Sequence, residues 1–422
     1  MHSELQVSMF NCAFIIKLLY ARRHLLLFLW CILASNPSQA FSILAHEAII
    51  DAEWAGNIKP LLLKKYPSAT AAELKQAYAY TYGGSLVADM GYMPFGSPYF
   101  TNLLHYVRSG DFITTLLDDA ESLDEYAFAL GALSHYMADK YGHSLATNLS
   151  VAIDYPLLKK KFGDVITYDD DHTSHSRIEF AFDVIQIAKG NYADAAFHNF
   201  IGFEIGTPVL ERAFRKVYGQ DLKTVFPNFD SSIATFRWGV RDLFPELARV
   251  ARRSDKAGIR LSQQSFTHKS FSDRMPKDAF NKQAGTFKAR PGLTAKLLAG
   301  LVQRLPKIGP LKKMGFKYPG VTCEALFLES MDSIMANYNL ALAKLKHGRT
   351  VELPNINYDT GNLSVLNEYT LADITYAEWL VKLENDNGAV ISPAIQQNIL
   401  AFYNKAAVPN LLASYINPGY LK

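Results

Sequence analysis

Apolar residues recur at spacings of three and four along most of residues 41–250, which is the repeat of a helix with one buried face. The repeat is clearest in five segments, at residues 44–54, 71–79, 123–145, 175–188 and 209–217. Long alternations of apolar and polar residues, which would indicate half-buried strands, do not occur in this part of the sequence. The sequence therefore predicts an all-α domain built from many helices.

The first forty residues have the pattern of a secretory signal peptide. Arg22 and Arg23 precede an apolar run at residues 25–34, and Ser38-Gln39-Ala40 supplies small residues before a cleavage point. The run is too short to span a bilayer comfortably. We expect cleavage near Ala40 and a secreted or periplasmic protein that begins at Phe41. An uncleaved anchor is the alternative, because a second apolar patch lies at residues 13–20.

Cysteine usage excludes two classes of small scaffold. The chain of 422 residues has three cysteines, Cys12, Cys31 and Cys323. A disulfide framework needs more of them, and a cysteine-based zinc finger needs them in closely spaced pairs. The sequence also has no G-x-x-x-x-G-K-[ST], G-x-S-x-G or C-x-x-C motif.

Residues 251–320 differ from the rest of the chain in charge, with sixteen Lys or Arg against three Asp or Glu. We expect a basic insert or linker here. Within it, residues 293–317 alternate Leu, Val and Ile with Lys and Arg, which suggests an amphipathic segment that contacts anionic lipid at a membrane surface. A solvated linker that pairs with the acidic remainder of the chain is the alternative.

Helical periodicity returns after the basic segment. It covers residues 324–345, 370–383 and 393–412, and a loop rich in Pro, Asn and Gly lies at 353–361. The predicted organisation is thus a signal peptide at 1–40, a catalytic domain at 41–250, a basic insert or linker at 251–320 and a helical C-terminal region at 321–422.

Histidines and carboxylates stand at helical spacing in the predicted catalytic domain. His135, Asp139 and His143 follow one another at steps of four, and His175 precedes Glu179 by four. Residues four apart share one helix face, roughly 5–6 Å apart at Cβ. Imidazole and carboxylate are the ligands that Zn²⁺ uses most, and burying such groups without partners is costly. Each pair alone could be a simple His–carboxylate contact.

Three more residues of the same chemistry precede these pairs, namely His46, Asp89 and His105. An ordered set of this size favours a metal centre over isolated pairs. We interpret His172, His198, His268 and His347 as residues that do not bind metal.

The ordered set resembles the zinc-dependent phospholipase C family. That family is related to the S1/P1 nucleases and to the catalytic domain of glycosylphosphatidylinositol-specific phospholipase D. The matching positions, within residues 41–203, are Phe41, His46, Asp89, His105, His135/Asp139, His143 and His175/Glu179. The step from Phe41 to His46 looks like the nuclease branch, whereas Glu179 at the end of the last pair looks like the phospholipase branch. Phe41 stands where the family usually has Trp, and the long interval after His143 suggests an inserted loop at 156–171.

The resemblance implies a multi-helix phospholipase C/P1 nuclease-like domain, with a mostly helical C-terminal extension, that holds three zinc ions. One ion would be bound by His105, His135 and Asp139, and a second by His143, His175 and Glu179. The third would be bound by His46, by Asp139 as a bridge, and by the main-chain amine and carbonyl of a mature N-terminal Phe41. Asp89 would be catalytic and would face the water between two metals.

The activity implied by the resemblance is hydrolysis of a phosphodiester by a metal-activated water, with clustered zinc ions neutralising the phosphate charge. A phospholipid headgroup is the expected substrate. The first alternative is a nuclease that acts on single-stranded nucleic acid, for which Tyr92, Phe95, Tyr99 and Phe100 could stack on bases. The second alternative is a catalytically silent zinc-binding helical protein.

Overall fold

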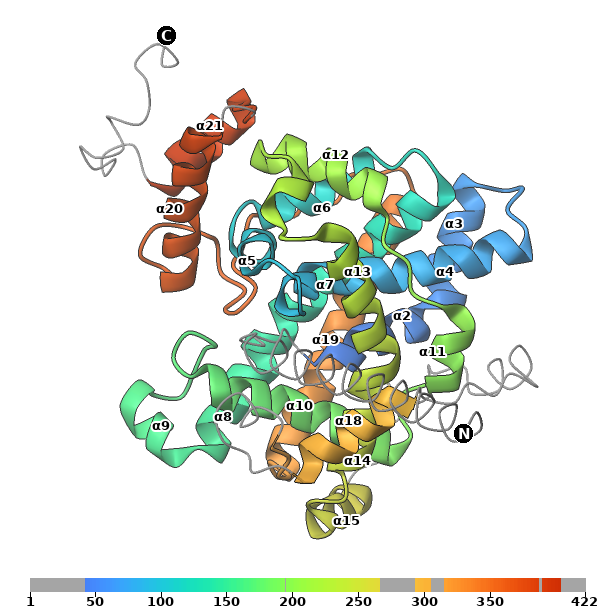
Figure 1. The fold of residues 1–422 in the computed structure, drawn as a ribbon, viewed down its shortest axis with the longest axis vertical. Helices are drawn as coiled ribbons and strands as arrows, with labels where there is room; N and C mark the ends of the chain where they lie inside the picture. The colour runs from blue at the N-terminus through green and yellow to red at the C-terminus, as the bar shows by residue number, and fades with distance from the viewer. Residues whose placement is uncertain (1–41, 194, 266–292, 305–314, 387–388, 404–422) are drawn as a thin grey trace, which may run out of the picture.

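The computed structural model describes residues 42–193, 195–265, 293–304, 315–386 and 389–403 (Figure 1). Helices dominate these ranges, and within them the only β pairing is an isolated antiparallel bridge between Ile356 and Leu363. The all-α prediction is therefore confirmed. The predicted signal peptide, Phe41 and His268 lie outside the described residues.

The region before residue 252 contains thirteen of the labelled α-helices. They are α2 (Ile43–Glu53), α3 (Lys59–Lys65), α4 (Ala71–Leu86), α5 (Pro98–Tyr106), α6 (Ser109–Asp118), α7 (Leu123–Gly142), α8 (Asn148–Asp154), α9 (Pro156–Phe162), α10 (His172–Lys189), α11 (Ala195–Ile201), α12 (Thr207–Tyr218), α13 (Phe229–Trp238) and α14 (Phe244–Ala251). The five segments with predicted helical repeats all lie in helices. The expected inserted loop at 156–171 instead begins with the short helix α9.

Short turns of other helical types join several of these helices. The 3₁₀ segments are η2 (Val87–Tyr92) and η4 (Leu222–Val225), and the π-helical segments are η1 (Trp54–Ile58), η3 (His143–Thr147) and η5 (Gly239–Leu243). Two of them carry predicted site residues, Asp89 in η2 and His143 in η3. Single π turns are frequent at functional sites because they re-aim side chains within a helix.

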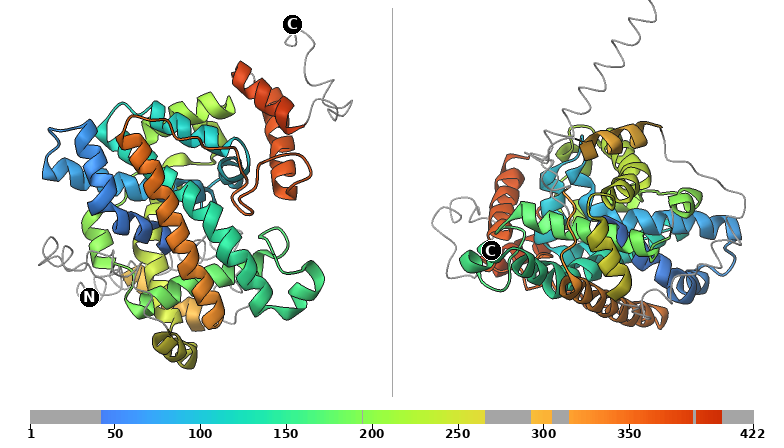
Figure 2. Two further views of the ribbon diagram at one scale, coloured as in Figure 1. Left: turned by 180° about the vertical axis from the view of Figure 1, so that it is seen from behind. Right: turned by 90° about the horizontal axis from the view of Figure 1, so that it is seen from below.

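The later part of the chain adds α15 (Lys256–Ser265), α18 (Leu293–Arg304), α19 (Val321–Lys346), α20 (Thr370–Asn385) and α21 (Pro393–Phe402). Seen from behind, α19 crosses the molecule as one long helix beside α7 (Figure 2). Tyr338 of α19 is fully buried, and its hydroxyl donates to the Leu130 carbonyl of α7 at 2.9 Å. The main apolar core runs from Ile43 to Tyr403 and is thus shared across the predicted domain boundaries, which remain a prediction.

Two glycines set the separation of α4 and α7, which pack closely against each other. A Cβ atom at Gly131 would lie 2.0 Å from the Thr81 carbonyl oxygen, and one at Gly84 would lie 1.9 Å from the Phe128 carbonyl oxygen. Only glycine permits such an approach of two backbones. As a result, the Ser85 carbonyl on α4 reaches the His135 ring on α7 at 2.9 Å.

The helices that carry the site also have well-defined beginnings. Ser122 accepts the Glu125 N–H at 3.2 Å where α7 begins, and Asp171 accepts the Ser174 N–H at 2.7 Å where α10 begins. Such caps satisfy main-chain donors that the first turn leaves free. They therefore fix the register in which His135 and His175 are presented. No helix in the described ranges is long and apolar enough to cross a bilayer.

Candidate metal centre

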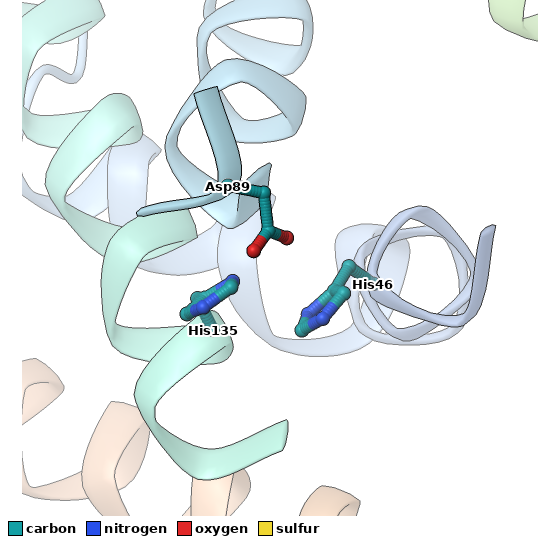
Figure 3. Close-up of side chains that lie close together, drawn as sticks. All are labelled: His46, Asp89 and His135. Carbon is teal, nitrogen blue, oxygen red and sulfur yellow. The ribbon is translucent and has the colours of Figure 1, made fainter. Parts of the chain in front are cut away.

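The predicted site residues that the structure describes converge on one buried region. The structure brings together five imidazoles and three carboxylates, each at most 2% exposed: His46 of α2, Asp89 of η2, His105 of α5, His135 and Asp139 of α7, His143 of η3, and His175 and Glu179 of α10. Figure 3 shows His46, Asp89 and His135, which come from three elements and point toward one another. Phe41 lies outside the described residues.

The side chains form three groups in which the potential ligand atoms all lie within 4.8 Å of one another. Two of them, His105/His135/Asp139 and His143/His175/Glu179, coincide with ligand sets implied by the resemblance. The third group is His46, Asp89 and His135. It places Asp89 close enough to a possible cation to be a ligand, although the resemblance implied a catalytic role.

Asp139 lies between the imidazoles of three helices. One of its oxygens is 3.4 Å from His46 Nε2, and the other is 3.1 Å from His135 Nε2 and 3.4 Å from His105 Nε2. The two oxygens of one carboxylate thus face different imidazoles. This is the arrangement that a bridging carboxylate requires.

Glu179 has the same relation to the second group. Its Oε1 lies 3.2 Å from His143 Nε2 and 3.1 Å from His175 Nδ1. The four-residue spacing of the His135/Asp139 and His175/Glu179 pairs therefore places both members of each pair on one helix face, as the sequence predicted.

Hydrogen bonds behind the rings decide which imidazole nitrogen faces the centre. Three rings donate Nδ1–H to a main-chain carbonyl oxygen: His105 to Thr101 at 2.9 Å, His135 to Ser85 at 2.9 Å and His143 to Tyr358 at 3.0 Å. Because a carbonyl can only accept, these rings present Nε2 to the centre. His175 is turned the other way, since its Nε2 contacts the Asn148 amide oxygen at 3.0 Å and its Nδ1 faces Glu179. Such outer contacts fix the orientation of ligating histidines.

Burial and mutual charge shift the pKa values of several groups. Burial, with the nearby His135, lowers the pKa of His46 to about 4, and burial raises the pKa of Asp89 to about 7. Burial also acts to lower the pKa of His135 and His143, but the charge of Asp139 and, for His143, the contact with Glu179 outweigh it. Their pKa values rise to about 9 and about 10. Protonated imidazoles and carboxylates thus balance one another, and a bound cation would replace those protons.

The donor atoms fit zinc. Apart from the His–carboxylate contacts given above, both carboxylate oxygens of Asp89, Asp139 and Glu179, with Nε2 of His105 and His135 and Nδ1 of His175, lack a hydrogen-bond partner within the described part of the chain. An unsatisfied buried polar atom costs about 1–3 kcal/mol. So many of them directed at common points indicate cation sites, and imidazole and carboxylate are both established ligands of Zn²⁺.

Sequence reasoning missed the residues that support the ligands. Asn148, Tyr358 and Asp359 contact the imidazoles from behind, but carbonyl and amide groups leave no pattern in a sequence. Of the histidines predicted not to bind metal, His172 and His347 are exposed and outside the three groups. His198 is buried between Glu47 and Asp51, with its two nitrogens 3.1 and 3.0 Å from their carboxylate oxygens.

The aromatic residues considered for base stacking are not equally accessible. Phe100 is fully buried against Phe214 and Phe226, and Tyr99 is 8% exposed with its hydroxyl bonded to Gln220. Only Phe95 is well exposed, at 47%, while Tyr92 is half-buried with its ring centroid 6.2 Å from that of His105. The structure therefore offers fewer stacking platforms beside the centre than the sequence suggested.

Comparison with known proteins gives one finding for this region. Residues 45–228 match the family model described as zinc dependent phospholipase C. No curated protein and no solved structure matches the chain. The matched segment contains every candidate ligand side chain from His46 to Glu179 and confirms the resemblance seen in the sequence. Residues 45–228 are therefore similar to the zinc-dependent phospholipase C family.

Proposed function

We propose that this protein is a zinc-dependent phosphodiester hydrolase that cleaves a phospholipid headgroup by phospholipase C-type hydrolysis. The observation that carries the proposal is the convergence of five imidazoles and three carboxylates on one buried centre within a segment similar to this family. Similarity to this zinc-dependent family supports the proposal that the protein is a hydrolase that uses zinc. The family's description as a phospholipase C supports a phospholipid as the substrate.

Three zinc ions are the proposed complement. His105, His135 and Asp139 would hold one, and His143, His175 and Glu179 would hold another. His46 and Asp139, which lie 3.4 Å apart, would hold the third, together with the main-chain amine and carbonyl of Phe41 after cleavage of the signal peptide. When bound, the metals neutralise the phosphate charge and acidify a water molecule.

Asp89 is the proposed general base. Its carboxylate lies 3.7 Å from His105 Nε2 at the edge of the first group. A carboxylate beside a metal-bound water can orient that water and accept its proton. Asp89 therefore orients the attacking water and takes its proton, while the imidazoles and the other two carboxylates hold the metals.

We further propose a secreted or periplasmic location and peripheral contact with a membrane through residues 293–317. On α18, Leu298 and Ala299 pack against α14, whereas Leu293 and Leu297 are 73% and 66% exposed on the opposite face. Lys296 lies on the exposed side between them. An exposed apolar stripe beside basic residues is suited to the surface of an anionic membrane.

The test uses protein that begins at Phe41 and compares phosphatidylcholine micelles with single-stranded DNA as substrates. We expect zinc in the purified protein and headgroup release from the lipid. His135→Ala, which removes a ligand shared by two groups, should lose both, and His347→Ala, an exposed histidine outside the centre, should lose neither. Cleavage of DNA without turnover of lipid would establish the nuclease alternative. Bound zinc without turnover of either would establish the silent zinc-binding alternative.

A further inference from the structure

The C-terminal region places three groups directly behind the candidate centre. The Tyr358 carbonyl accepts His143 Nδ1–H at 3.0 Å, and Asp359 Oδ1 lies 3.5 Å from the same nitrogen. The Asp359 carbonyl accepts a hydrogen bond from the Asn148 side-chain amide at 2.7 Å. Tyr358 and Asp359 lie far beyond residue 228, where the family match ends.

Through Asn148, residues 358–359 also orient a second imidazole, that of His175. Because the Asn148 Nδ2 donates to the Asp359 carbonyl, its Oδ1 is the atom that faces His175. An amide oxygen only accepts, so His175 donates from Nε2 at 3.0 Å and keeps Nδ1 for the centre. The same two residues, Tyr358 and Asp359, therefore orient both imidazoles of the His143/His175/Glu179 group.

The segment itself is held in place by α5, which carries His105, and by Tyr369 at the start of α20. Tyr358 N–H donates to the His105 carbonyl at 3.1 Å, and Asp359 Oδ2 accepts the hydroxyls of Tyr106 at 2.9 Å and Tyr369 at 2.5 Å. Asn357, Tyr358 and Asp359 are all buried, at 0%, 1% and 3% exposure. A segment fixed at this many points cannot move without displacing the imidazoles that it contacts.

The His105/His135/Asp139 group and the His143/His175/Glu179 group differ in how far their orientation depends on the C-terminal segment. His105 and His135 are oriented by the carbonyls of Thr101 and Ser85, which lie within the family-matched segment. The C-terminal segment contributes a ring contact to the side chains of these two histidines. The centroid of the Tyr358 ring lies 5.2 Å from that of His105 and 5.7 Å from that of His135. The tautomers of the His143/His175/Glu179 group depend on residues 358–359, whereas those of the His105/His135/Asp139 group do not.

We infer that residues 357–359 form part of the metal centre, with Asp359 and Asn148 as positioning residues for the His143/His175/Glu179 group. This inference rests on the proposed zinc-binding function. Outer contacts of this kind are worth about 10–100-fold in metal affinity. The C-terminal region thus completes a site whose ligand side chains all come from the first half of the chain.

The experiment measures zinc stoichiometry and affinity by competition with a chelator in Asp359→Asn and Asn148→Ala. Asp230→Asn and Asn385→Ala, which change exposed residues, are the matched controls. We expect each test variant to weaken one bound zinc by about 10–100-fold and to leave the other ions and the controls unchanged. Equal loss of all ions, or unchanged affinity in a variant with a native circular dichroism spectrum, would overturn the inference.

A second measurement does not depend on zinc and separates this inference from the proposed function. In ¹⁵N-histidine-labelled, metal-free protein, the His175 ring should carry its proton on Nε2, with the signal assigned by its loss in His175→Gln. Asn148→Ala should move that proton toward Nδ1. A His175 signal that is the same in wild type and Asn148→Ala would refute the positioning role, even if wild-type protein bound no zinc.

Discussion

The main-chain N–H of Leu44 donates to a carboxylate oxygen of Asp183 at 3.1 Å and thereby ties the start of α2 to α10. The Ser42 hydroxyl donates to the other oxygen of the same carboxylate. Ser42 is next to the proposed mature N-terminus, and His46 lies one turn further along α2. The position of Ser42 and Leu44 is therefore set by a buried contact with the helix that carries His175 and Glu179.

The Asp183 carboxyl gives a pH dependence of stability. Burial raises its pKa to about 7, although the Ser42 hydroxyl and the Leu44 N–H lower it in part. An aspartate in the unfolded chain has a pKa of about 3.9. Between these values the folded protein binds the proton more tightly, so the free energy of unfolding falls as the pH rises, by up to about 1.4 kcal/mol per pH unit.

The free energy of unfolding is measured with urea on metal-free protein between pH 4.5 and pH 8. The protein carries Gly-Ser before Phe41, which moves the terminal amine away from the Asp183 carboxyl. As the pH rises to about 7, the free energy of unfolding of wild type should fall relative to that of Asp183→Asn. Above about pH 7, the difference between the two proteins should stay constant. A difference between the two proteins that is constant from pH 4.5 to pH 8 would contradict the prediction. Asp164→Asn, at an exposed aspartate, serves as the control.

The mature N-terminus gives a second prediction. An amide nitrogen is a poor metal ligand, whereas a neutral terminal amine is a good one. Protein that begins at Phe41 should therefore bind one more zinc ion per chain than protein with Gly-Ser before Phe41, and it should turn over substrate faster. Atomic emission gives the zinc content of both forms. Equal zinc in the two forms would exclude Phe41 as a ligand.

Asp89→Asn separates the two roles that the structure allows for this residue. As a general base, Asp89 contributes about 10²–10⁴ to the rate, so the variant should lose that factor in kcat and keep its zinc. As a ligand in the His46/Asp89/His135 group, it would instead contribute to metal affinity. Zinc analysis beside the kinetic assay decides, and loss of zinc in the variant would rule out the proposed base.

The exposed leucines of α18 predict membrane association. Leu293→Glu with Leu297→Glu should reduce sedimentation with vesicles that contain phosphatidylserine, since the change removes the apolar stripe and adds repulsive charge. Leu157→Glu is the matched control, because Leu157 is 84% exposed but lies on α9. Binding of wild type should weaken with added salt. Equal binding by the double variant would show that α18 does not contact lipid.

Much of the fold was predictable because the helices that carry the candidate ligands are long enough to repeat their apolar pattern. The segments around His46, His135 and His175 each show several turns of it. α9 was not predicted, since its seven residues, which begin with Pro156, bury no side chain and leave no apolar repeat. Helices of that length depend on tertiary contacts more than on local pattern.

The candidate site was predictable in its ligand types and order, but not in its orientation. The four-residue spacing of His135 and Asp139 places both on one face from geometry alone. Nothing in the sequence shows that His143 would meet the Tyr358 carbonyl, because that contact depends on how α19 and the following segment pack. The grouping of Asp89 with His46 likewise arises only when η2 is placed between α2 and α7.

The contact between His143 and the Tyr358 carbonyl has a consequence for how the protein is made. A ribosome produces every candidate ligand side chain, from His46 to Glu179, well before it reaches Tyr358. A nascent chain thus holds metal-binding groups for a long interval without the segment that orients His143 and His175. The centre can reach its final geometry only after most of the chain has been synthesised, which makes correct metal loading a late event in biogenesis.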